Sequence, residues 1–329
     1  MKKVRRPVDL YRVEGHPALF VSGETIMAAL QYYSPQLADE RAYYGALMGW
    51  SFFFDAEERM PVGLPANELI HRNLYYLYGI ERREVRRDNF ADLWQAIEES
   101  IAADRVLLAW VDARDVSDAA FQYNRTPSAS EAMLIYGYEQ ATDMLTILVN
   151  PQGFVGQVPL SCLPEMLPEL VVYDYAVPEG LDPYPVEKME QVLLGDVREM
   201  LAGNKVGRVE TGLPAAQRFV EEMGRQIEQD EESMRVWMRE VFCQMALLGP
   251  QRQRLDDNLR RLAAATGLGA LSAAADTFGD LGRRWETTRD LFCKGACNDP
   301  AAMLKRIREC VQGLLSLEEA QARFLLQWL

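Results

Sequence analysis

Apolar residues in the first half of the chain recur with two different periods. Spacings of three and four residues, typical of amphipathic helices, are found over 22–33 and 90–103. Ser34-Pro35, an N-cap followed by proline at the first helical position, predicts a further helix over 34–44. Short runs rich in β-branched and aromatic residues predict strands at 106–111, 132–138, 144–149, 154–160 and 170–175. The third and fourth strands are joined by Asn150-Pro-Gln-Gly153, a turn sequence that favours a hairpin. Helices followed by an antiparallel sheet indicate an α+β domain.

The second half has helical spacing almost throughout. The pattern predicts helices near 187–202, 214–248, 252–266, 268–291, 301–313 and 317–328. The last of these is expected to begin at Ser316-Leu-Glu-Glu319, which has the sequence of a capping box. No repeat of fixed length is visible, so the pattern favours an all-α helical bundle over a solenoid.

A short segment with the composition of a linker separates the two halves. Val177–Pro185 contains three prolines and one glycine in nine residues. A chain of 329 residues is also long enough for two domains. We therefore predict an α+β domain over 1–180 and an all-helical domain over 186–329.

Composition and charge narrow the classes of protein that this chain can be. Its 49% hydrophobic and 26% charged residues are typical of a soluble globular protein, and no apolar stretch is suited to a membrane span. The formal charge of −14 argues against a nucleic-acid binder. Residues 1–186 carry 15 Lys/Arg against 27 Asp/Glu, which would attract a cationic small molecule. Two basic clusters, 2–6 and 82–87, are either solvated surface or docking sites for an acidic protein.

The cysteines and the N-terminus indicate a reducing compartment. Acidic residues occupy the place that a signal peptide fills with apolar ones, so we expect a cytoplasmic protein with free thiols. Cys293, Cys297 and Cys310 form a weak metal pattern, because structural zinc needs four ligands and the chain has only two histidines. No metal or resident cofactor is expected.

The segment that begins at Ser22 is the best candidate for chemistry. A small polar residue stands there at the mouth of a helix whose Ile26, Ala29, Leu30 and Tyr33 form an apolar stripe. A nucleophile at a helix N-terminus gains from the positive end of the helix dipole. Papain-like enzymes place their nucleophile in this way, and later strands supply a histidine base and an Asn or Asp that orients it.

Further motifs stand at spacings that match a known family. They are Ser22, Tyr33, Asp39-Glu40, Tyr44-Gly-Ala-Leu-Met-Gly-Trp-Ser-Phe-Phe-Phe54, Glu131-Ala-Met-Leu-Ile-Tyr-Gly-Tyr-Glu139, Leu145-Thr-Ile-Leu-Val-Asn-Pro151, Arg252–Thr266 and Trp285–Phe292. With these the chain resembles the family of butirosin biosynthesis protein H, which transfers an acyl group from a carrier protein to an aminoglycoside. The resemblance implies a papain-like, cysteine-peptidase-type domain followed by a helical domain. It also implies an acyl group delivered on a carrier-protein phosphopantetheine.

The chain departs from this family at the reactive positions. Ser22 stands where the family has its cysteine, Glu131 where it has its histidine, and Asn150 where it has an acidic orienter. Serine without a base is a weak nucleophile. Ser22 is therefore either a nucleophile or only a helix cap. Glu131 or His16 is the candidate proton acceptor, with an ion pair at Glu131 and a loop position for His16 as the alternatives.

The sequence leaves the roles of two sets of apolar residues open. Tyr44, Trp50 and Phe52 either line a cleft for an acyl chain or pack in a core. Met223, Met234, Met238 and Met245 fall near helical spacing and indicate either bundle core or a face for a homodimer.

The sequence leaves three functions open. The first is an acyltransferase or amide-forming enzyme of bacterial specialised metabolism, with an acyl carrier protein docked at Arg82–Arg87 and an amine as acceptor. The second is a pseudoenzyme that binds a carrier protein, a peptide or a metabolite. The third is a peptidase or amidase, which would need the missing base most.

Overall fold

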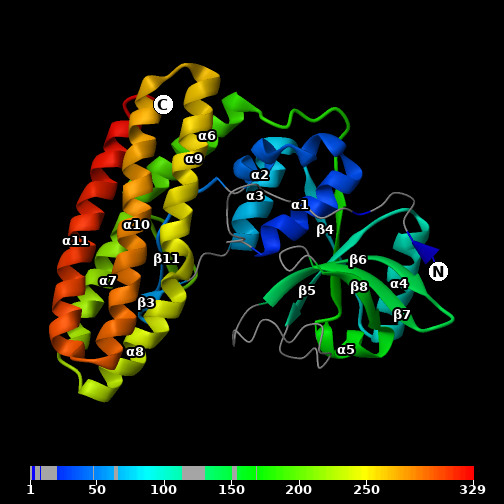
Figure 1. The fold of residues 1–329 in the computed structure, drawn as a ribbon, viewed down its shortest axis with the longest axis horizontal. Coiled ribbons are helices and arrows are strands. Elements are labelled where there is room, and N and C mark those ends of the chain that lie inside the picture. The colour runs from blue at the N-terminus through cyan, green and yellow to red at the C-terminus, as the bar shows by residue number, and fades with distance from the viewer. Residues whose placement is uncertain are drawn as a thin grey trace. The chain divides into compact units, whose positions relative to one another are not determined.

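The computed structural model describes residues 2–3, 8, 21–46, 48–62, 66–112, 130–149, 154–167 and 169–329. Over these residues the fold is mixed α+β, with two antiparallel sheets and a helical C-terminal region (Figure 1). The chain forms two compact units. Unit 1 comprises 1–46 and 70–184, and unit 2 comprises 47–69 and 185–329.

The division between the units adds a segment to the helical half that the sequence pattern did not place there. The second unit resumes at Pro185, the last residue of the predicted linker. Residues 47–69, however, belong to unit 2 and join its helices, although more than a hundred residues separate them from the rest of this unit along the chain. Helix α3 (Ala66–Tyr78) continues across the division, which falls between Leu69 and Ile70.

Unit 1 is built on a seven-stranded sheet. Its order is β4 (Glu81–Arg86), β9 (Val171–Ala176), β5 (Leu107–Asp112), β6 (Ser130–Glu139), β7 (Met144–Val149) and β8 (Phe154–Pro159), with β1 (Lys2–Lys3) also paired to β6. Every pairing is antiparallel, as predicted. The five predicted strands are confirmed as β5, β6, β7, β8 and β9. The sequence pattern missed β1, which has two residues, and β4, whose residues are mostly charged and exposed.

Helices cover both faces of this sheet. Helix α1 (Val21–Tyr33) and the short helix α5 (Leu163–Met166) lie on opposite faces (Figure 1). Helix α4 (Phe90–Ala102), which confirms the predicted helix, begins where Asn89 accepts a hydrogen bond from the Asp92 amide. Together with α5 and the strands, α4 forms a hydrophobic cluster that includes Leu93, Ile97, Val111, Met133, Ile135 and Val172.

The first helices differ in detail from their predictions. Helix α1 is buried on all sides over 23–30, rather than along one stripe. The helix predicted over 34–44 is divided into a 3₁₀ turn, Pro35–Ala38, and helix α2 (Glu40–Ala46). Asp39 lies between the two, and its carboxylate accepts a hydrogen bond from the Arg41 amide at 2.9 Å. That bond favours a new helix start over a continuous helix.

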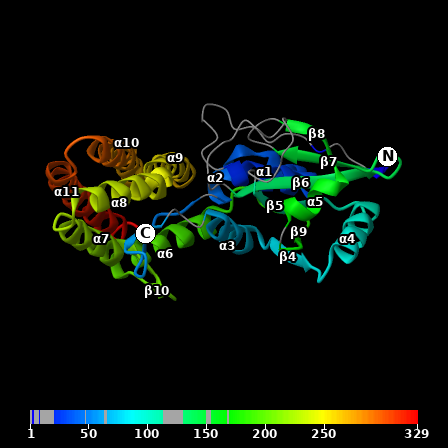
Figure 2. The same ribbon diagram turned by 90° about the horizontal axis from the view of Figure 1, so that it is seen from below.

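Unit 2 is a bundle of helices with a small sheet. Its helices are α6 (Val186–Ala202), α7 (Gly212–Gln226), α8 (Glu231–Gln244), α9 (Leu248–Thr266), α10 (Gly269–Cys297) and α11 (Pro300–Leu325). Its sheet has the order β10 (Lys205–Val206), β11 (Val209–Thr211), β2 (Phe53–Asp55) and β3 (Met60–Pro61). Helices α9 and α10 lie side by side along their length (Figures 1 and 2). All four methionines of the predicted stripe are buried in this unit, as the bundle-core alternative required.

Two predicted helix boundaries in this unit are wrong. The single helix expected over 214–248 is interrupted, because Asp230 caps a new helix by accepting from the Ser233 amide at 3.0 Å. The two helices expected after residue 300 are one helix, α11. The hydroxyl of Ser316 bonds to the Gln312 carbonyl inside α11, at 3.1 Å, instead of capping a helix. Among the described residues, no helix is long and apolar enough to cross a membrane.

Candidate functional site

Ser22 lies in the first turn of α1. The helix begins at Val21, so the backbone of Ser22 is inside the helix rather than ahead of it. Glu24 is buried in the same turn, where a carboxylate suits the positive end of the helix dipole. The first turn of α1 can thus stabilise negative charge next to position 22. The structure describes the backbone of Ser22 but not its side chain.

The other end of α1 is fixed to the sheet by two tyrosines. The Tyr33 hydroxyl lies 3.1 Å from Oδ1 of Asp174 and 3.0 Å from both the carbonyl oxygen and the amide nitrogen of Val106. Burial and the Asp174 carboxylate raise the pKa of Tyr33 well above its ordinary value. Tyr32 donates to Asp104 at 2.7 Å. These contacts tie the C-terminal end of α1 to β9 and to the segment just before β5, and the apolar pattern gave no sign of them.

Glu131 lies on the strand against which α1 packs. Helix α1 contacts β6 and β5, and position 131 of β6 is paired with Val111 of β5. Alternate positions of a strand share a face, so position 131 belongs to the face of Met133 and Ile135. Those two side chains belong to the hydrophobic cluster around α4, on the face opposite α1 (Figure 1). The side chain of Glu131 is not described.

The remaining candidates for catalysis lie outside the described residues. His16 falls in the gap before α1, and Asn150 follows Val149, the last residue of β7. Strands β6 and β7 are nevertheless neighbours, with Leu134 opposite Leu148. The backbone of positions 131 and 149 therefore lies in one sheet, and the backbone of position 22 lies in the helix that packs on this sheet.

The second histidine of the chain, His71, is held inside unit 1. It lies on α3, and its ring meets the ring of Tyr175 edge to face at 5.9 Å. Both ring nitrogens are buried, and neither has a hydrogen-bond partner among the residues that the structure describes. Burial, with a smaller effect of Arg82, lowers the pKa of His71 to about 4. His71 is neutral at pH 7, and its ring packs against Tyr175.

Two of the aromatic candidates for a cleft are in the core of unit 2. Trp50 and Phe52 are each 1% exposed. The Trp50 ring lies 4.7 Å from Phe278, edge to face, and the Phe52 ring lies 5.8 Å from Phe219 and 6.1 Å from Trp285. The structure thus shows core packing for both. The third candidate, Tyr44, has its backbone in α2, and its side chain is not described.

A sealed ion pair fixes this aromatic segment to the bundle. Arg252 of α9 donates from Nε and Nη2 to the two carboxylate oxygens of Glu318 of α11, at 2.7 and 2.9 Å, and both side chains are 0% exposed. Nη1 of Arg252 donates to the carbonyl oxygen of Ser51 at 2.9 Å. The indole N–H of Trp285 donates to Glu318 at 2.7 Å. One buried network therefore joins α9, α10, α11 and the segment around residue 51.

The basic stretch predicted as a docking site lies on β4, at an edge of the sheet. Arg86 pairs with Glu84 at 2.8 Å, and the guanidinium of Arg82 lies 4.9 Å from the ring centre of Tyr173. β4 also carries Glu81, so its sequence Glu-Arg-Arg-Glu-Val-Arg holds both acidic and basic side chains. The five cysteines are free thiols, and no group of three or more His, Cys, Asp or Glu in the described part of the chain could hold a metal.

Comparisons with known proteins leave the family of the chain undetermined. No family model matches the sequence, and no curated protein matches it either.

Proposed function

We propose that unit 1 is a papain-like acyl-transfer domain of the butirosin biosynthesis protein H type. It would move an acyl group from a carrier-protein thioester to an amine. One observation supports this most: Ser22 stands in the first turn of a buried helix that packs against β6, the strand of position 131. That order of helix and strands is the one in which papain-like enzymes hold nucleophile and base.

The proposed reaction has two halves. The Ser22 oxygen attacks the thioester carbonyl, a C–O bond forms, the C–S bond breaks, and the carrier thiol leaves with the proton taken from Ser22. The amine nitrogen then attacks the resulting ester, a C–N bond forms, and the C–O bond breaks. The proton of the amine returns to the Ser22 oxygen. His16 would carry the proton, and Asn150 would orient its imidazole. Glu131 suits this role less well, because position 131 lies on the face of β6 opposite α1.

Transfer from a thioester suits the residues of this chain better than peptide hydrolysis. A thioester gives up its acyl group more readily than an amide, so it demands less of the base. The helix dipole at Ser22 would also favour the oxyanion that forms during the attack. The acidic first half of the chain would attract a cationic amine, and an acidic carrier protein would dock at Arg82–Arg87.

The proposal is tested by trapping the ester on the protein. The full chain is incubated with small acyl thioesters of several chain lengths and examined by intact-mass spectrometry. We expect one acyl adduct on the wild-type protein and none on Ser22→Ala. Ser34→Ala is the matched control, because Ser34 follows the other end of α1 and makes no side-chain cap bond. Ser22→Cys should form the adduct faster, since a thiol ionises more readily than a hydroxyl.

A pseudoenzyme is the alternative, and two observations favour it. Position 131 shares its face of β6 with side chains that pack toward α4, and the ring nitrogens of His71, on α3, are buried with no hydrogen-bond partner among the described residues. If no thioester labels the wild-type protein, acyl transfer through Ser22 is refuted. Binding of a carrier protein with equal affinity to wild type and Ser22→Ala would then establish the alternative.

A further inference from the structure

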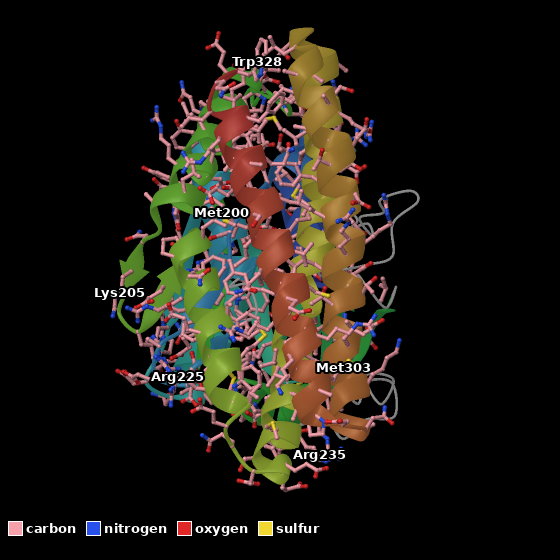
Figure 3. All side chains as sticks on the ribbon, turned by 90° about the vertical axis from the view of Figure 1, so that its left-hand side faces the viewer. Met200, Lys205, Arg225, Arg235, Met303 and Trp328 are labelled. Carbon is pink, nitrogen blue, oxygen red and sulfur yellow. The ribbon has the colours of Figure 1, made fainter. Side chains whose placement is uncertain are left out.

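A pocket in unit 2 is lined by residues from three helices. It has a volume of about 520 Å³ and lies where the end of α6 and the start of α7 face α11. Ligand sites of proteins commonly have volumes of a few hundred to a thousand Å³. Figure 3 looks onto this side of the unit, with α11 in red and α6 and α7 in green; the labelled Met200 precedes the lining residue Leu201.

The pocket has an apolar wall and a charged rim. Leu201, Leu213 and Leu315 supply apolar surface. At the rim, Glu319 and Arg323 stand one turn apart on α11, with side chains 48% and 67% exposed. The pocket therefore presents one acid and one base beside a surface that suits an apolar group.

The charged pair at the rim has unused bonding capacity. Nε and Nη2 of Arg323 both donate to the same oxygen of Glu319, Oε1, at 3.0 and 2.7 Å. Oε2 of Glu319 and Nη1 of Arg323 have no partner among the described residues. The side-chain amides of Gln217 and Gln312 line the same pocket and also make no hydrogen bond to described residues. A ligand with one cationic and one anionic group could bind both partners of the pair at once.

Two helix ends of opposite polarity meet at this pocket. Helix α6 ends one residue after Leu201, and α7 begins one residue before Leu213. The last turn of α6 has no basic residue, and the first turn of α7 has no acidic residue. The negative end of one helix dipole and the positive end of the other are therefore uncompensated by side chains. The two ends lie against each other, since a Cβ at Gly212 would be only 2.6 Å from the Glu199 carbonyl oxygen, and their opposite dipoles therefore partly offset one another.

We propose that this pocket binds a free α-amino acid with a large apolar side chain. Its carboxylate would bind Arg323 and the first turn of α7, its ammonium group would bind Glu319, and its side chain would lie on the leucines. The assignment is independent of acyl transfer at Ser22, because every lining residue belongs to unit 2.

Titration calorimetry of the full chain tests the assignment. The probes are L-leucine, L-phenylalanine and L-tryptophan, together with the amine and the acid that leucine gives on losing its carboxylate or its amino group. We expect saturable binding of at least one amino acid, and weaker binding of both leucine analogues. Arg323→Gln and Glu319→Gln should each weaken binding by about tenfold or more, because each removes a charge-assisted contact.

A matched pair on α10 provides the control. Arg284 pairs with Asp280 at the same spacing, at 2.6 Å and with similar exposure, but it does not line the pocket. Arg284→Gln should therefore leave binding unchanged. The proposal is refuted if none of the three amino acids binds, if the amine or the acid binds as well as leucine, or if Arg323→Gln binds like the wild type.

Discussion

Each unit buries an acidic side chain against an arginine, and the two pairs differ in their access to water. In unit 1, Asp174 is buried, but its partner Arg105, at 2.8 Å, remains 42% exposed. In unit 2, Arg252 and Glu318 are both fully enclosed. The open pair secures the end of a helix close to its own sheet. The enclosed pair secures a segment that comes from the other half of the chain.

The difference shows how a buried charge can select one arrangement of a core. An aromatic segment such as 48–54 could pack against many apolar surfaces, whereas the Ser51 carbonyl meets only one buried guanidinium among the described residues. Burying an ion pair gives little net stability, because desolvation offsets the attraction. We infer that Arg252 and Glu318 specify where the segment docks more than they stabilise it.

The largest difference in stability between the two ion pairs is expected on replacing Arg252. Arg252→Ala would leave the Glu318 carboxylate buried without its cation, which should lower the free energy of unfolding by about 3–5 kcal/mol. Arg105→Ala should cost less, because solvent reaches that site and Asp174 keeps its bonds to Tyr33 and to the Tyr175 amide. Chemical denaturation of the two variants measures both values.

A double variant tests whether the Arg252–Glu318 pair specifies where the segment docks or stabilises unit 2. Arg252→Met with Glu318→Leu removes both charges and fills similar space, so it should recover most of the stability that the single change loses. Equal losses in the single and double variants would show that the pair itself stabilises the unit, and would contradict this interpretation.

Much of the fold of unit 1 is encoded locally, and this explains which predictions hold. The strands at 144–149 and 154–159 and the helix at 90–102 have clear apolar periods bounded by turn or cap residues. A period shows that a residue is buried, but not which surface covers it. The pattern around Trp50 therefore predicted burial without revealing that its partner, Phe278, lies in the other half of the chain.

In unit 1, the protonation of His71 is expected to make the free energy of unfolding depend on pH. The folded protein holds the pKa of this imidazole at about 4, below its ordinary value of 6.5. Between these values the unfolded chain binds the proton first, so stability is complete above pH 6.5 and falls as the pH drops toward 4. The loss from this group is about 3 kcal/mol at most.

Thermal unfolding across this pH range tests the effect. His71→Phe should remove that part of the pH dependence, because it keeps an aromatic ring at this position but has no titrating nitrogen. His16→Phe, at the other histidine of the chain, is the control and should retain the pH dependence at His71. Identical pH profiles for wild type and His71→Phe would show that the imidazole is not desolvated.

The smallest effect is expected at Ser316 of unit 2. A true N-cap serine contributes about 1 kcal/mol. In the middle of α11, where the hydroxyl only bonds back to Gln312, Ser316→Ala should change the free energy of unfolding by a few tenths of a kcal/mol at most. A loss near the full cap value would show that α11 is interrupted at this point, as the capping-box pattern predicted.

The candidate sites differ in how far sequence could locate them. Ser22 was predicted from its place at the mouth of a helix, and Glu131 from a resemblance in motif order. Neither signal gives the face on which a side chain lies. The pocket at Glu319 and Arg323 left no signal, because its lining is contributed by α6, α7 and α11. Neither a motif nor a period joins residues that meet only after the helices have packed.

The docking of the aromatic segment has a consequence for synthesis on the ribosome. Ser51 and Arg252 are 201 residues apart. At a translation rate of about 5–20 residues per second, Trp50 and Phe52 leave the ribosome roughly 10–40 seconds before the guanidinium that anchors them is made. During that interval they are apolar side chains without their final core. A chaperone that binds short aromatic stretches in nascent chains would have both the time and the target here, and its loss should lower the yield of folded protein.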